Sequence, residues 1–155
     1  MAFWQRWTSR ARAFILLDGP RRLLGLEAVV LMPVGSMWLR LGGLGRMQRA
    51  IVSRTDHRQT GRVEEHLTAT LVLAVESAAR VWHANCLRRS VTLWWMMRRR
   101  GLDPQLRIGV RSTDQTPAFH AWLELDGRVL NDADDVAAHY TPFDRSATPP
   151  NARFE

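Results

Sequence analysis

Apolar residues repeat at two different periods along this 155-residue chain. Between residues 67 and 82 they recur at helical spacing, which predicts an amphipathic helix. Between residues 105 and 111 apolar and polar residues alternate, which predicts a half-buried strand. The period changes near Gly101, so the helices come first along the chain and an antiparallel sheet follows. This order predicts an α+β fold.

A strongly apolar helix is predicted near the N-terminus. Asp18-Gly19-Pro20 forms a helix start, and an apolar run over residues 23–31 follows it. We expect Pro33-Val34-Gly35 to end this helix and a short helix to occupy residues 36–41. Glu27 interrupts the run and the proline ends it, so the run is shorter than the roughly 20 residues that a membrane span needs. Such a helix lies in a core, on a membrane surface or against a partner.

The second half of the chain adds a helix and a hairpin. The helix is predicted over residues 86–100, with Thr92 among its outward-facing residues. Two strands, over residues 119–125 and 128–132, flank Asp126-Gly127, a strong hairpin turn. Together with the earlier strand they form an antiparallel meander.

Chain length limits the domain organisation. A chain of 155 residues is long enough for one domain with one core. Residues 52–62 are polar and irregular, which predicts a linker. We therefore expect an N-terminal helical extension over residues 1–60, a core domain over 61–145 and a flexible tail over 146–155.

The charge is unevenly distributed along the chain. All 22 basic residues are arginines, and the net charge is +7. Residues 1–60 carry ten arginines against three acids, whereas residues 101–155 carry five against nine. A basic half is typical of proteins that bind nucleic acid or a membrane surface. The arginines are scattered over turns and helix flanks, however, without a zinc-finger or RNA-binding motif, so we expect no nucleic-acid ligand.

The single cysteine, Cys86, is the first candidate for chemistry. One cysteine excludes an internal disulfide and fits a reducing compartment; without a convincing targeting segment, we expect a cytoplasmic protein. Asn85 is a preferred N-cap, which places Cys86 in the first turn of its helix. Free backbone N–H groups there favour a thiolate, and the N–H of Cys86 is the candidate oxyanion donor. A lone cysteine is otherwise more often a small buried residue.

The hairpin supplies His120 and Asp132 as partners for the cysteine. A two-residue turn at Asp126-Gly127 would set these two side chains on opposite faces of the sheet. A three-residue loop, Leu125-Asp126-Gly127, would instead set them opposite each other, and we predict this loop. If that face covers the start of the Cys86 helix, a Cys-His-Asp triad results. Taken singly, each of these residues is more often a solvated or structural side chain.

Several segments between residue 67 and residue 143 together resemble the sequences of one known protein family. They are Cys86-Leu87-Arg88-Arg89-Ser90, Arg98-Arg99-Arg100-Gly101-Leu102, Leu106-Arg107-Ile108-Gly109-Val110, Phe119-His120-Ala121-Trp122-Leu123-Glu124, Val129-Leu130-Asn131-Asp132, Asp135-Val136 and Tyr140-Thr141-Pro142-Phe143. In this order and context they resemble the transglutaminase-like leader peptidases of lasso-peptide biosynthesis, which are papain-type cysteine proteases.

The resemblance implies a papain/transglutaminase-like fold, with N-terminal helices and a nucleophile helix packed on a small antiparallel sheet. It implies Cys86 as the nucleophile, His120 as general base and then acid, and Asp132 as the orienting carboxylate, with Asp135 as the alternative. The implied enzyme is a cysteine peptidase that removes the leader from a ribosomally made lasso-peptide precursor. An ATP-dependent cyclase then closes the macrolactam ring. No cofactor and no metal are implied.

The resemblance also implies a partner. Many members of the family carry, or depend on, a small winged-helix domain that binds the leader. Residues 1–60 read as apolar helices instead, so we expect the leader-binding protein to be a separate chain.

Other functions stay open at this point. A transglutaminase-like acyltransferase shares the chemistry as far as the thioester and passes the acyl group to an amine. A non-enzymatic adaptor would bind a membrane or nucleic acid through its arginine-rich first half. A metal site is the weakest alternative, because His57, His66, His83 and His139 lack metal-binding spacing.

Overall fold

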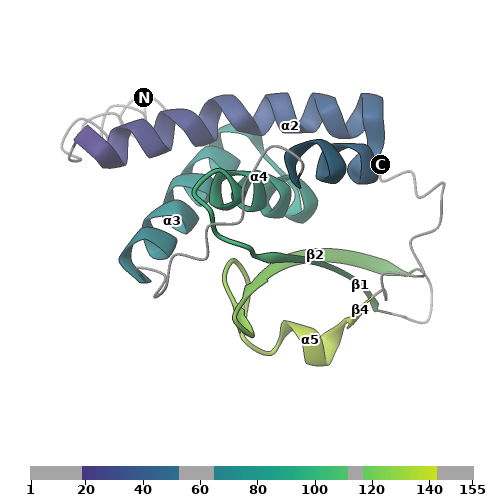
Figure 1. Ribbon diagram of the computed structural model, residues 1–155. Helices are drawn as coiled ribbons and strands as arrows, with labels where there is room; N and C mark the ends of the chain where they lie inside the picture. The colour runs from purple at the N-terminus through teal and green to yellow at the C-terminus, as the bar shows by residue number, and fades with distance from the viewer. Residues whose placement is uncertain (1–18, 53–64, 112–116, 143–155) are drawn as a thin grey trace, which may run out of the picture.

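The computed structural model describes residues 19–52, 65–111 and 117–142, which form a layer of helices over a small sheet (Figure 1). The helices are α2 (Gly19–Val52), α3 (Glu65–Trp82) and α4 (Cys86–Arg98). The strands are β1 (Gln105–Arg111), β2 (Ala118–Leu125), β3 (Arg128–Val129) and β4 (Thr141–Pro142), and the short helix α5 (Val136–His139) precedes β4. The predicted α+β order is confirmed.

The sheet is antiparallel throughout, in the order β3-β2-β1-β4. The first three strands form the predicted meander, and β4 pairs with the far side of β1, where Pro142 lies opposite Gly109. Gly109 also lies opposite His120 of β2. The third strand is shorter than predicted, since its pairing ends at Val129. Most of the predicted linker and the whole predicted tail lie outside the described residues.

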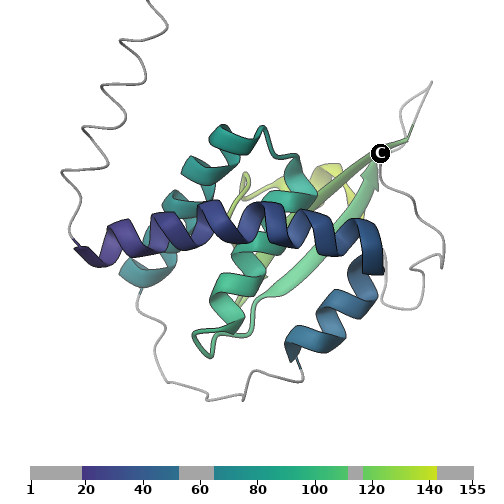
Figure 2. The same cartoon turned by 90° about the horizontal axis from the view of Figure 1, so that it is seen from above.

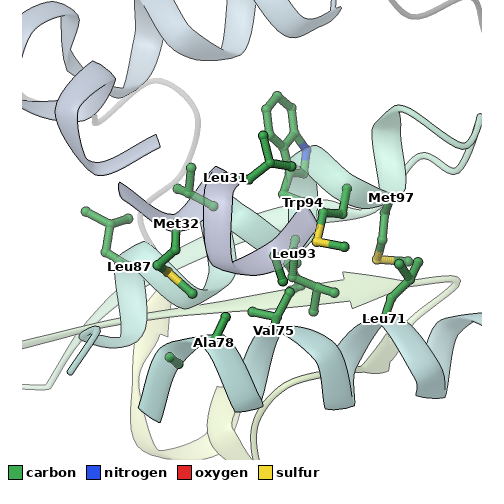
Figure 3. Close-up of a cluster of buried hydrophobic side chains, with 14 of the residues drawn as sticks. Leu31, Met32, Leu71, Val75, Ala78, Leu87, Leu93, Trp94 and Met97 are labelled. Carbon is green, nitrogen blue, oxygen red and sulfur yellow. The ribbon is translucent and has the colours of Figure 1, made fainter. Parts of the chain in front are cut away.

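Helix α4 is the central element of the fold. One side packs on β2, and α2 and α3 cover the other sides, with apolar side chains of all three helices meeting in one cluster (Figure 3). The prediction that Thr92 faces outward was wrong, because α2 covers that side. Thr92 is buried, and its hydroxyl lies 3.3 Å from Sδ of Met32.

Helix α2 continues through Pro33, so the predicted break at Pro33-Val34-Gly35 was wrong. A proline has no N–H to donate to the carbonyl four residues earlier, which here belongs to Val29. The indole N–H of Trp82 in α3 donates to that carbonyl instead, at 2.9 Å. A tertiary contact therefore satisfies the acceptor that the proline leaves open, and α2 remains helical.

The chain bends in α2 at Gly43 instead, after which a shorter helical segment runs in a new direction (Figure 2). Gly43 has φ 70° and ψ 164°, a conformation that glycine adopts without the strain a Cβ would cause. Because the helix does not end at Pro33, the expectation of a short apolar run was also wrong. By length and composition alone α2 could cross a membrane, a test that core helices and signal sequences also pass.

The inner side of α2 belongs to the same hydrophobic core as the rest of the molecule. Met32 and Met47 are fully buried there, beside residues of α3 and α4. The boundary near residue 60 stays a prediction, but the described part of the predicted extension shares its core with the predicted core domain.

Candidate active site

Cys86 is the first residue of α4, as predicted. The side chain of Asn85 accepts a hydrogen bond from the backbone N–H of Arg88 at 3.1 Å, which confirms Asn85 as the N-cap. This bond satisfies one of the free donors at the helix start. The Cys86 thiol is half-buried at that end of the helix.

Cys86 and His120 lie at the same end of the sheet. Helix α4 leads into β1, whose first residue, Gln105, pairs with Glu124 near the end of β2. The end of α4 is therefore close to the end of β2, and its start is close to the start of β2. Ser90, one helical turn after Cys86, donates a hydrogen bond to the carbonyl of Ala121 at 2.9 Å. Ala121 directly follows His120, so this bond holds the first turns of α4 beside the His120 segment.

His120 and Asp132 contact each other directly. Imidazole Nε2 lies 2.6 Å from Oδ2 of the carboxylate, and both side chains are largely buried. The other oxygen, Oδ1, accepts the backbone N–H of Ala133 at 2.9 Å. A carboxylate at Nε2 favours the tautomer protonated there, which leaves Nδ1 free to accept a proton.

The turn and the strand register that bring His120 and Asp132 together differ from the predicted ones. Leu125 pairs with Arg128 around a two-residue turn, so the predicted three-residue loop was wrong. Asp126 and Gly127 both have positive φ, 50° and 78°, as the tight hairpin turn matching the twist of the strands requires. Regular pairing in this register would turn Asp132 away from the His120 face.

The pairing of β2 with β3 ends before Asp132, so this register does not determine the face on which Asp132 lies. The N–H of Leu130 still bonds to the carbonyl of Leu123 at 2.9 Å. The N–H of Leu123 then donates to the side chain of Asn131, at 2.8 Å, rather than to a backbone carbonyl. The chain has left the ladder at this point, so strand alternation no longer decides where Asp132 points.

Ser90 and Asn131 form a buried polar link between α4 and the hairpin. The side-chain amide of Asn131 donates to Ser90 Oγ at 2.8 Å, and the backbone carbonyl of Asn131 accepts from Arg89 at 3.0 Å. Ser90 and Asn131 are the residues that our reading of the sequence missed. The sequence could have indicated both residues. Ser90 is four residues after Cys86 on the same helix face, and Asn131 directly precedes Asp132.

Aromatic rings enclose the imidazole. Tyr140 stacks on His120 with centroids 4.8 Å apart, and Trp122 lies at 6.2 Å with its plane 22° from that of His120. Gly109 lies opposite, where a Cβ would be 2.9 Å from Cβ of Tyr140 and 3.0 Å from the Trp122 ring. Glycine at this position therefore allows the aromatic rings to close around His120.

Glu124 fixes the Trp122 ring from its outer edge. The indole N–H of Trp122 donates to Oε1 at 2.9 Å, and Arg107 donates to Oε2 at 2.9 Å. Burial acts to raise the pKa of Glu124, but these hydrogen bonds and the charge of Arg107 outweigh burial and lower the pKa below its usual value of 4.5. Glu124 is therefore a structural carboxylate that remains ionised at neutral pH.

In the described part of the chain, His120 is hydrogen-bonded to Asp132 but not to Cys86. Ala121 and Leu123 face the helices and belong to the core, so the alternation along β2 turns His120 and Trp122 to the other face. That face lies on the side of α5 in Figure 1. No hydrogen bond between Cys86 and His120 occurs in the described part of the chain, so the Cys86-His120-Asp132 triad stays a prediction.

The remaining candidate residues have other partners. Asp135 is exposed and contacts His139 at 3.1 Å, so Asp132 is the carboxylate at His120. His66 accepts a hydrogen bond from Arg21 at 3.1 Å. Within residues 19–52, 65–111 and 117–142, no three His, Cys, Asp or Glu side chains gather as a metal site. His57 lies outside these ranges.

The described structure combines a cysteine at the start of α4 with a strand histidine bonded to a carboxylate at the same end of the sheet. A family model of the transglutaminase-like superfamily matches residues 31–145, and the chain belongs to this superfamily. The predicted family and fold class are confirmed.

The chain is also similar to a particular curated protein. It is 31% identical over 88 residues to the microcin J25-processing protein McjB of Escherichia coli. The matched part is 56% of this chain and 41% of McjB, so the chain spans less than half the length of this relative. No solved structure matches the chain.

Proposed function

We propose that this protein is a cysteine peptidase that removes the leader from a ribosomally made lasso-peptide precursor. The observation that carries the proposal is the His120–Asp132 pair, at 2.6 Å, at the end of the sheet where α4 begins with Cys86. Membership of the transglutaminase-like superfamily and the similarity to a microcin J25-processing protein support it.

Each residue has a defined role in the proposed reaction. The Cys86 thiolate attacks the scissile carbonyl carbon, and backbone N–H groups at the start of α4 stabilise the oxyanion. The C–N bond breaks as His120 gives a proton to the leaving amine. Water then attacks the thioester and gives its proton to His120, which releases the leader as a carboxylate and regenerates the thiolate. Asp132 stabilises the charged imidazole throughout.

Cys86 and His120 must come closer for this reaction. Catalytic hydrogen bonds are often long or poorly aligned before substrate binds and tighten in the complex. Asp132 occupies Nε2, so Nδ1 is the nitrogen that we expect to face the thiol.

The proposed partners follow from the same function. A separate leader-binding protein delivers the precursor, and an ATP-dependent cyclase takes the product, all in the cytoplasm. Precursor is incubated with the purified protein, with and without the leader-binding protein, and free leader is measured by mass spectrometry. We expect the partner to increase the cleavage rate at least tenfold (roughly 1.4 kcal/mol). Equal rates would contradict the need for a partner.

The Cys86→Ala variant tests the nucleophile. We expect it to lose cleavage and labelling by iodoacetamide, because Cys86 is the only thiol in the chain. Ser77→Ala, an exposed substitution on α3, is the control and should keep both. A Cys86→Ala variant that still cleaves the leader would exclude thiol chemistry.

An acyltransferase is the second candidate, because the superfamily match supports a transglutaminase-like fold without deciding the acyl acceptor. Mass spectrometry in the presence of an added primary amine separates the two reactions. A leader with a free carboxylate supports the peptidase, and a leader–amine adduct as the main product supports the acyltransferase.

A further inference from the structure

The outer side of α2 carries a line of large apolar side chains that no described part of the chain covers. Their exposed fractions lie between 46% and 79%. We call them the α2 stripe: Leu23, Leu26, Val30, Val34, Met37 and Leu41.

The α2 stripe is straight. Its positions are separated by steps of three, four, four, three and four residues, so the pattern repeats every 11 residues. A repeat of 11 residues is close to the natural period of the α-helix, so the stripe does not drift around the helix. It extends over about 27 Å at 1.5 Å per residue. The opposite side of α2 faces the core, and α2 forms the outermost layer of the molecule (Figure 1).

The charge around the α2 stripe is positive. Glu27 is the one acid within α2, and it is largely buried against Arg99 and Arg100, at 3.3 and 2.5 Å. Arg40, which directly precedes Leu41 of the stripe, is exposed, as are Arg46 and Arg49 beyond the bend at Gly43, whereas Arg21 contacts His66 of α3. Over residues 1–52 the sequence has eight arginines against two acids, and tryptophans at positions 4 and 7.

We propose that the α2 stripe binds the surface of an anionic lipid bilayer, with α2 lying in the plane of the membrane. A straight apolar line on a helix whose exposed charges are all arginines is the composition of an interfacial helix, and anionic headgroups supply the negative charge that this helix lacks. This proposal goes beyond leader cleavage and does not depend on it.

A spanning helix would not fit the same observations. Ala28 and Met32 are fully buried against the other helices, and spanning would remove them from the core. Binding in the plane leaves this packing unchanged. Because the sheet lies on the far side of the helical layer (Figure 1), the bound protein presents His120 away from the bilayer.

Vesicle sedimentation tests the proposal on the full chain. The vesicles consist of phosphatidylcholine, with or without phosphatidylglycerol. We expect sedimentation with the anionic vesicles only, weakening as salt increases. Met37→Glu places a charge in the stripe and should weaken binding at least tenfold. Leu73→Glu is the matched control: Leu73, on α3, is 67% exposed and Met37 63%, so the charge change is the same but the stripe is intact.

Three results would overturn the proposal. The parent protein could fail to bind anionic vesicles, or Met37→Glu could bind as well as Leu73→Glu. Light scattering could instead show a parent dimer that Met37→Glu dissociates, without vesicle binding by either, which would make the stripe a contact between copies. Circular dichroism checks that both variants fold. Cleavage of soluble precursor is measured separately, and its failure would count against the proposed peptidase and not against membrane binding.

Discussion

At the level of single residues, His120 has its position defined by contacts on several sides. Asp132 bonds to Nε2, Tyr140 stacks on the ring, and Gly109 leaves room for both Tyr140 and Trp122. These contacts come from separate segments of the chain. Each can be tested by one substitution.

Replacing Asp132 by alanine should reduce kcat/KM for leader cleavage by about 10²–10⁴-fold, because the imidazolium loses its carboxylate. Asp135→Ala is the matched control, since Asp135 contacts only exposed His139 among the described side chains. It should stay within about threefold of the parent. A larger loss for Asp135→Ala than for Asp132→Ala would reverse the assignment of the carboxylate.

A methyl group at Gly109 should disturb the aromatic rings around His120. Gly109→Ala places a Cβ about 3 Å from Tyr140 and Trp122, and we expect it to lower the free energy of unfolding by about 1–3 kcal/mol. In urea denaturation, Gly45→Ala serves as the comparison, because Gly45 lies in α2 and a Cβ there would meet only the end of the Arg49 side chain, at an ordinary contact distance of 3.6 Å. Gly45→Ala should be neutral or stabilising; equal losses for both variants would show that the crowding at Gly109 is not specific.

The ionised form of Glu124 should make stability depend on pH. Its pKa is lower in the folded than in the unfolded protein, so its contribution is present at neutral pH. This contribution is lost as the pH falls below about 4.5 and through the folded pKa. Glu124→Gln should therefore cost about 1 kcal/mol at neutral pH, and the difference from the parent should shrink on acidification. Urea midpoints across this pH range would measure it, and a difference that grows on acidification would contradict it.

At the level of elements, the buried link between Ser90 and Asn131 holds α4 against the hairpin. Asn131 accepts from β2, donates to α4 and directly precedes Asp132. One side chain therefore connects the nucleophile helix, the histidine strand and the carboxylate segment.

Asn131→Ala should lower the free energy of unfolding by about 2–3 kcal/mol, because the Leu123 N–H loses its acceptor inside the protein. Well below the melting temperature, it should also lower kcat more than it raises KM, because it loosens Asp132 and α4 together. Ser77→Ala removes an exposed helical hydroxyl and should have little effect on either. An unchanged kcat in a destabilised Asn131→Ala would limit Asn131 to a structural role.

At the level of the whole molecule, α2 has two different faces. Its inner face completes the core over α4, and its outer face carries the α2 stripe. A helix with apolar residues on both sides would look like a core helix from composition alone. The tertiary structure shows that only one side is buried.

Met32→Ala and Met37→Ala separate these two faces. Met32 is fully buried and Met37 is exposed on the same helix, so Met32→Ala should cost about 2–5 kcal/mol and Met37→Ala less than about 0.5 kcal/mol. Thermal or urea unfolding measures both. Equal and small effects would mean that residues 1–60 form an extension separate from the core domain.

The sequence by itself determined the order of helices and strands, the N-cap at Asn85 and the position of the hairpin turn at Asp126-Gly127. These features depend on local periodicity and on residues a few positions apart, whose preferences act within one element. The contact of His120 with Asp132 was also predicted, but from a three-residue loop that the structure does not contain.

Only the tertiary structure decided the path of α2 and the way in which Asp132 reaches His120. Trp82 satisfies the carbonyl that Pro33 leaves open, from 53 positions along the chain. Ser90 and Asn131, 41 positions apart, replace the ladder where β3 ends. A local pattern does not show which distant donor will satisfy a buried acceptor, because that depends on how the elements pack.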